Sequence, residues 1–194
     1  MPRPMPTLAL AALMAVSSWQ SQVAIASEES SSTNDASQIY TAFLEHWHGS
    51  GHDTLNVSRI AKPPTKEEID GFTSCASEEN AQKPEWDQAS EAKDLESDIG
   101  ELAYVRLMDP EEWHSTDPED LMSKGQSVES AVDAGFAGGL LTFSTIVFDK
   151  SHETAAITYS FVCGSLCGNG GSVIFKKTPK GWVQNEKSCG MWMS

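Results

Sequence analysis

The sequence predicts an α+β domain in which N-terminal helices pack on a C-terminal antiparallel β-meander of about four strands. Helical apolar spacing and capping signals dominate before residue 140, and alternating strands separated by turn residues follow. Hydrophobic residues make up 39% of the chain, with six Trp and seven Phe, which indicates a packed core. We therefore predict a signal peptide over 1–26, a disordered lead-in over 27–38 and a single α+β domain over 39–194.

The charge of the chain argues against a nucleic-acid partner. It carries 28 acidic and 13 basic side chains, for a formal net charge of −15. Phosphate backbones are bound by basic surfaces, so this class of partner is excluded. Residues 171–194 are the exception, with four Lys and one acid, so an anionic partner would be sought at the sheet.

The N-terminus has the pattern of a secretory signal peptide. Arg3 precedes an apolar run of ten residues, Thr7–Val16, and small residues stand at Ala24 and Ala26. The run is shorter than the roughly 20 residues that cross a bilayer. We predict a soluble exported protein, periplasmic or secreted, with no membrane anchor after cleavage.

The first predicted helix covers Ile39–His48, after a polar, Ser-rich lead-in. Its apolar side chains share one helical stripe: Ile39, Tyr40, Phe43, Leu44 and Trp47. A capping box at Thr65–Glu68 predicts a second helix through Phe72. The weakly patterned stretch from 78 to 101 predicts one helix around Trp86–Leu95, and two short strands are expected over 55–60 and 101–108.

Three further helix starts precede the sheet. Asp109-Pro110 and Asp117-Pro118 each offer an N-cap followed by proline at the first helical position. A short helix is predicted over Ser127–Phe136. The predicted strands are Leu140–Phe148, Ala155–Cys163, Ser172–Lys177 and Trp182–Met193.

The predicted strand over 155–163 alternates in polarity. Its odd-numbered positions are apolar, whereas Thr158 and Ser160 lie on the other face. We therefore expect one sheet face to meet the core beneath the helices and the other to be wetter.

The four cysteines predict disulfides, because an even count is typical of an exported protein. Three pairings are possible. Cys163 and Cys167 are close enough in sequence to join where the chain turns back, which leaves Cys75 with Cys189.

Three functional hypotheses can be considered for the segment Cys163–Gly171 (CGSLCGNGG): a redox pair, a catalytic thiol or a phosphate-binding loop. A redox pair needs C-x-x-C at a helix start, a phosphate-binding loop needs a following helix, and a catalytic thiol needs a partner base. We favour a disulfide-pinned hairpin loop whose four glycines adopt unusual backbone angles.

Three histidines, His46, His48 and His52, are the only candidate metal ligands that the sequence suggests. On a helix, His46 and His48 point about 160° apart, so they cannot share one ion. We favour a helix end with exposed histidines and predict no metal site and no cofactor.

No catalytic residue is predicted. His152-Glu153 lacks the second histidine of a zinc-protease motif, because position 156 is Ala156. The acid pairs Glu111/Glu112 and Asp117/Glu119 suit helix starts for electrostatic reasons alone.

The last third of the chain resembles an uncharacterised group of exported bacterial proteins. The resemblance covers 135–194 and lies in these motifs: FSTIVFD at 143–149, an Ala-x-x-x-Tyr strand, CGxLCGxG at 163–170, KGW at 180–182 and WMS at 192–194. It departs from the group at Gly171, where an aromatic residue is usual, and at Cys189. The resemblance implies a small α+β domain and brings no established activity.

The leading functional hypothesis is a binding or interaction module without catalysis, whose partner is an unknown protein or small molecule. Two alternatives stay open. One is a cell-envelope hydrolase that uses paired carboxylates, and the other is a metal-binding protein that uses His46, His48 and His52.

Overall fold

The computed structural model describes residues 20–49, 54–77 and 83–194. Thr33–Ser194 form one compact unit. Most of the predicted signal peptide falls on residues 1–19, outside the described residues, so it stays a prediction.

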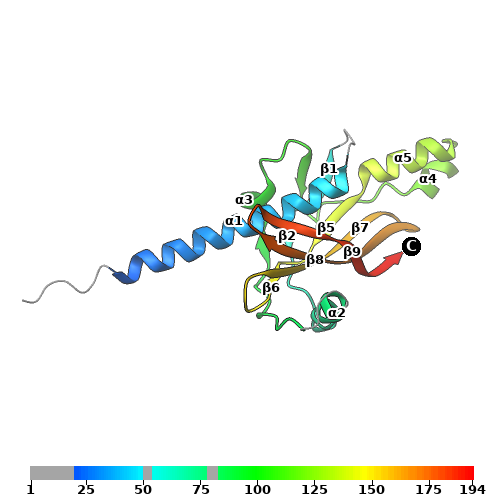
Figure 1. The fold of residues 1–194 in the computed structure, drawn as a ribbon. Coiled ribbons are helices and arrows are strands. Elements are labelled where there is room, and N and C mark those ends of the chain that lie inside the picture. The colour runs from blue at the N-terminus through cyan, green and yellow to red at the C-terminus, as the bar shows by residue number, and fades with distance from the viewer. Residues whose placement is uncertain (1–19, 50–53, 78–82) are drawn as a thin grey trace, which may run out of the picture. The chain divides into compact units, whose positions relative to one another are not determined.

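A mixed seven-stranded sheet, in the order β4-β1-β5-β7-β8-β9 with β6 paired to β7, forms the centre of this unit (Figure 1). Its strands are β1 Leu55–Ser58, β4 Val105–Met108, β5 Leu140–Phe143, β6 Val147–Phe148, β7 Thr154–Gly164, β8 Cys167–Thr178 and β9 Gly181–Met193. β1 is parallel to both β4 and β5, and the other pairs are antiparallel. The predicted α+β class holds, but the sheet is larger than a four-strand meander and is not purely antiparallel.

The helices and a small second sheet complete the fold. The helices are α1 Gln20–His48, α2 Lys66–Ser77, α3 Glu96–Ile99, α4 Pro118–Ser123 and α5 Val128–Gly138, and the second sheet pairs β2 Ile60–Ala61 with β3 Lys93–Asp94. No described helix is both long enough and apolar enough to cross a membrane.

The α1 helix begins well before the predicted Ile39, so residues 27–38, predicted to be a disordered lead-in, are helical. Asp35 and Ala36 are buried, and Asp35 Oδ2 lies 2.8 Å from Lys177 Nζ of β8. These tertiary contacts hold Asp35 and Ala36, in a part of the chain whose polar composition alone gave no helical signal.

The predicted apolar stripe of α1 packs on one face of the sheet. Tyr40 and Phe43 contact the ring of Phe143, and the Tyr40 hydroxyl donates to Ser144 O at 2.9 Å. Burial, followed by the nearby Asp98, raises the pKa of Tyr40. The odd-numbered positions of β7 join the same core: Ala155, Ile157, Tyr159, Phe161 and Cys163. The prediction of this stripe and this alternation is confirmed.

The opposite face of the sheet is covered in part by α2. The predicted capping box is present: Glu68 N–H donates to Thr65 Oγ1 at 3.2 Å, and Thr65 N–H donates to Glu68 Oε2 at 2.6 Å. Phe72 packs with Ala156 and Ile174. This face is therefore wetter than the first only where α2 does not cover it. The Cys75–Cys189 disulfide fastens α2 to β9.

Two predicted helices are absent. Residues 86–92 contain no helix. Instead, the backbone of Trp86 forms an isolated β-bridge with Asp149, and its indole Nε1–H donates to Thr73 Oγ1 at 3.0 Å. At Asp109 the carboxylate accepts from Glu111 N–H at 2.9 Å and closes a turn that does not continue as a helix. The predicted strand Leu140–Phe148 is also divided, into β5 and β6.

The glycines of the CGSLCGNGG segment lie mostly inside β8, which corrects the predicted long loop. None of them has a positive φ. A Cβ at Gly170 would lie 2.4 Å from Trp192 Nε1. Glycine is therefore required here because a tryptophan lies directly on the strand, not because the backbone turns.

Candidate functional site

The α4–α5 pair is tied to the turn between β7 and β8 by one carboxylate. Asp117 caps α4, with Oδ1 accepting from Glu119 N–H at 3.0 Å, as its Asp-Pro sequence predicts. Its Oδ2 accepts from Ser165 N–H in the turn at 2.9 Å. Hydrogen bonds from the hydroxyl and N–H of Ser165, and then from Glu119 N–H, hold the pKa of Asp117 below its ordinary value.

The turn is pinned on its other side by the Cys163–Cys167 disulfide, whose Cα atoms lie 5.1 Å apart. Both disulfides thus join the pairs that the sequence indicated. A Cβ at Gly164 would lie 2.8 Å from Pro118 Cδ, so glycine lets the turn approach α4 closely. Between the two cysteines, the Leu166 side chain is 79% exposed.

A hollow of about 370 Å³ lies between this turn and the two helices. We call it the Leu166 groove, and its lining residues are Asp117, Pro118, Glu119, Met122, Val132, Ser165, Leu166 and Cys167. The walls are mainly apolar, and two acidic residues, Asp117 and Glu119, are among the lining residues. The groove therefore combines mainly apolar walls with two negative charges in its lining.

Exposed large apolar side chains concentrate on α4, α5, the turn and the end of β9, and three of them, Met122, Val132 and Leu166, line this groove. Nine are found in the described part of the chain, and eight of them belong to α4, α5, the turn or the last residues of β9: Met122, Val128, Val132, Phe136, Leu166, Met191, Trp192 and Met193. The end of β9 is placed beside the start of β8 by the pairing of Met193 with Asn169 (Figure 1). A concentration of this kind marks an interaction site more often than scattered exposure does.

The chain around the groove is strongly acidic. Residues 109–139 contain eight Asp or Glu side chains and one Lys. The acids are Asp109, Glu111, Glu112, Asp117, Glu119, Asp120, Glu129 and Asp133. This segment therefore carries a local excess of negative charge.

The candidate histidine ligands are not brought together. His46 is exposed at the end of α1, and the His48 ring stacks on Tyr104 at a centroid distance of 4.6 Å. His52 lies outside the described residues. Within the described ranges, no group of three or more His, Cys, Asp or Glu side chains is arranged to hold a metal ion. His48 instead lines a separate hollow of about 610 Å³ with Trp47, Phe136 and Phe161.

The acid pair Asp117/Glu119 stands at the start of α4, and the pair Glu111/Glu112 stands in the turn after Asp109. Hydrogen bonds hold the pKa of Asp117 below its ordinary value, which favours its ionised form. Glu111 and Glu112 are both exposed. His152 is exposed, with its ring stacked on Phe148 and its Nε2 3.6 Å from Asp87 Oδ2.

No protein-family model, no curated protein and no solved structure matches the chain. The geometry of the surface is therefore the basis for a functional assignment. Sequence reasoning singled out the Cys163–Cys167 turn and missed Leu166 within it. The available signal was a large apolar residue in a two-cysteine turn, where polar residues are usual.

Proposed function

We propose that the protein is an exported, non-catalytic interaction module that binds a protein segment through the Leu166 groove. The segment carries an apolar side chain flanked by Lys or Arg. The observation that carries this proposal is the groove itself, an apolar hollow of about 370 Å³ between a disulfide-pinned turn and two capped helices.

The exposure of Leu166 supports burial by a partner. Covering a leucine side chain fully is worth about 1.5–3 kcal/mol of transfer free energy. Leu166 is 79% exposed, and Met122 and Val132 add 37% and 36% exposed side chains in the same groove. A partner side chain that fills the groove would cover all three at once.

The rigidity of the turn supports a specific fit. The turn is held by the Cys163–Cys167 disulfide, the Asp117–Ser165 hydrogen bond and the close packing of Gly164 on Pro118. A surface held in its binding conformation loses less conformational freedom on association. Leu166 is therefore presented with a smaller ordering cost in the turn.

The charges select the partner. The groove is bordered by Asp117 and Glu119 and belongs to a segment with eight acids and one Lys. Basic residues on each side of the inserted apolar side chain would face this rim, and opposite charge accelerates association and discriminates against acidic partners.

Export is part of the proposal, and its site of action is periplasmic or extracellular. The signal-peptide pattern of residues 1–26 supports it, and two disulfides suit an oxidising compartment.

The test is a binding assay with synthetic peptides that contain a Leu-Phe centre flanked by Lys, or by Glu. The Lys peptide should bind, and Leu166→Asp should weaken its binding at least tenfold, about 1.4 kcal/mol. Val183→Asp is the matched control, because Val183 is 52% exposed on β9 and outside the groove. Equal binding of both peptides, or unchanged binding by Leu166→Asp, would overturn the proposal. So would self-association abolished by Leu166→Asp, which would assign the groove to a second copy of the chain.

A further inference from the structure

A second hollow, of about 290 Å³, opens on the sheet face that α2 covers only in part. It lies over β5 and β7, whereas α2 contacts mainly β8 and β9. This volume is at the small end of ligand pockets, which suits a small metabolite better than a nucleotide or a peptide. The residues of this hollow are distinct from those of the Leu166 groove.

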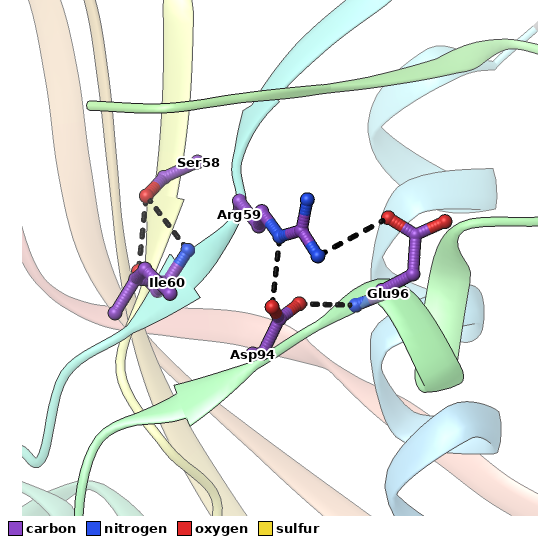
Figure 2. A network of polar contacts seen from close by, with 5 residues as sticks. All are labelled: Ser58, Arg59, Ile60, Asp94 and Glu96. Carbon is purple, nitrogen blue, oxygen red and sulfur yellow. Dashed lines mark hydrogen bonds and ion pairs between the residues drawn. The ribbon is translucent and has the colours of Figure 1, made fainter. Parts of the chain in front are cut away.

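One wall of the hollow is fixed by the break between β1 and β2. The Ser58 hydroxyl donates to Ile60 O at 2.9 Å and accepts from Ile60 N–H at 3.3 Å. Figure 2 shows the Arg59 side chain directed away from this contact, toward Asp94 Oδ2 at 2.8 Å and Glu96 Oε2 at 4.0 Å. The wall is therefore formed before any ligand binds.

The floor of the hollow is made of hydroxyl groups from two adjacent strands. Thr142 of β5 is paired with Ser160 of β7, and its hydroxyl donates to Ser160 O at 3.3 Å. The hydroxyls of Ser160 and Thr158 have no hydrogen-bond partner among the described residues, and both side chains are partly exposed. They are free to donate to and accept from a polar ligand.

The lining of the hollow includes one basic and one acidic residue, Lys62 and Glu68. Within the described part of the chain, the Lys62 ammonium makes no ion pair, while its backbone is held by Thr145 N–H and Phe143 O. Glu68 also lines the hollow. Its Oε2 accepts from Thr65 N–H in the cap of α2, which leaves its other carboxylate oxygen, Oε1, for a ligand. A ligand with both charges matches this pair, whereas a purely anionic or purely cationic ligand meets one like charge.

We propose that this hollow binds a small zwitterion of the free amino acid class. The ligand carboxylate lies at Lys62, its ammonium lies at Glu68, and the hydroxyls of Thr158 and Ser160 bind its polar groups.

The test is an NMR titration of the full exported chain with L-serine, N-acetyl-L-serine, L-serinamide and glycerol as probes. L-Serine should shift the amide signals of Thr158 and Ser160 in a saturable manner. The probes that lack one charge or both should bind at least tenfold more weakly. Equal or tighter binding of the acetylated probe would show an anion site, and binding of glycerol alone would show a polyol site. Either result, or the absence of any shift with L-serine, overturns the proposal.

Two variants test the contacts of Lys62 and Glu68 with the ligand, and a third serves as the control. Lys62→Gln and Glu68→Gln should each weaken L-serine binding at least tenfold. Glutamine at position 68 preserves the capping box, so a loss there reports the charge and not the fold of α2. Ser172→Ala is the matched control, because Ser172 is paired with Thr158 on β8 and lies outside the hollow. Wild-type affinity in both Gln variants would contradict the assignment.

Discussion

Two regions carry many apolar side chains: the sheet face beneath α1, and the surface of α4, α5 and the Cys163–Cys167 turn. In the first region these side chains are buried, and in the second they are exposed to solvent. Beneath α1, Tyr40 and Phe43 are 1% and 2% exposed, whereas Phe136 and Leu166 are 55% and 79% exposed. The first set stabilises the fold by being removed from water. The second set is held in place by helix caps and a disulfide and stays exposed. Under the proposed function, stability and binding therefore belong to different regions.

Replacing one phenylalanine in each region should give the largest difference in the free energy of unfolding. Phe43→Ala removes a ring that contacts Trp47, Phe143 and Tyr159, and we expect it to lower the free energy of unfolding by about 3–5 kcal/mol. Phe136→Ala loses mainly its stacking on Phe161, worth about 0.5–1.5 kcal/mol. Urea unfolding of both variants measures the difference, and equal losses would remove the distinction between the regions.

The two disulfides should separate stability from binding. Replacing Cys75 and Cys189 with Ala opens a bridge of sequence separation 114, and we expect a loss of about 2–4 kcal/mol. Replacing Cys163 and Cys167, separated by 4, should cost less, because closure entropy grows with loop length. The second pair should nevertheless weaken peptide binding more, since it holds Leu166. Peptide affinity that falls equally in both variants would contradict this division.

Loss of the α2 cap should have a moderate effect on stability and none on the groove. Thr65→Ala removes the acceptor for Glu68 N–H, which costs about 1 kcal/mol. Thermal unfolding should show the loss, while affinity for the Lys-flanked peptide should equal that of the wild type. A weakened affinity would mean that the two regions are coupled.

The smallest effect is the pH dependence of the turn at Asp117. Because its folded-state pKa lies below the ordinary 3.8, its stabilising contribution is present above that value and is lost as pH falls through the folded-state pKa. An NMR titration of the Asp117 carboxyl should give a midpoint below 3.8, and Ser165→Ala should raise it by removing the hydroxyl donor. A midpoint at or above 3.8 in the wild type would show that the carboxylate does not hold the turn.

The parts of the fold that were predictable have strong local signals. The stripe from Ile39 to Trp47, the Thr65 and Glu68 capping box and the alternation of β7 each follow from side-chain spacing within one element. The parallel strands β1 and β4 have four residues each, too few for alternation to specify partner or direction. The sheet was therefore predicted too small and purely antiparallel.

Only the residues that hold the candidate site in place were predictable from the sequence. The Asp117 cap and the Cys163–Cys167 pair follow from local sequence, and both are present. The exposure of Leu166 and Met122 depends on how the turn lies against α4, which is a contact between segments far apart in the chain. The proposed amino acid site joins residues 62, 68, 158 and 160 from three segments, and no sequence motif connects them.

The most direct test of the central claim is to map, by amide chemical shifts, where the Lys-flanked Leu-Phe peptide binds. We expect saturable shifts confined to the Leu166 groove, in the turn at 165–167, in α4 and along the Val132 side of α5. We also expect that the Glu-flanked peptide causes no such shifts. Shifts centred instead on the edge of β9 or on the hollow over β5 and β7, or no shifts at all, would contradict the claim that the groove is the binding site.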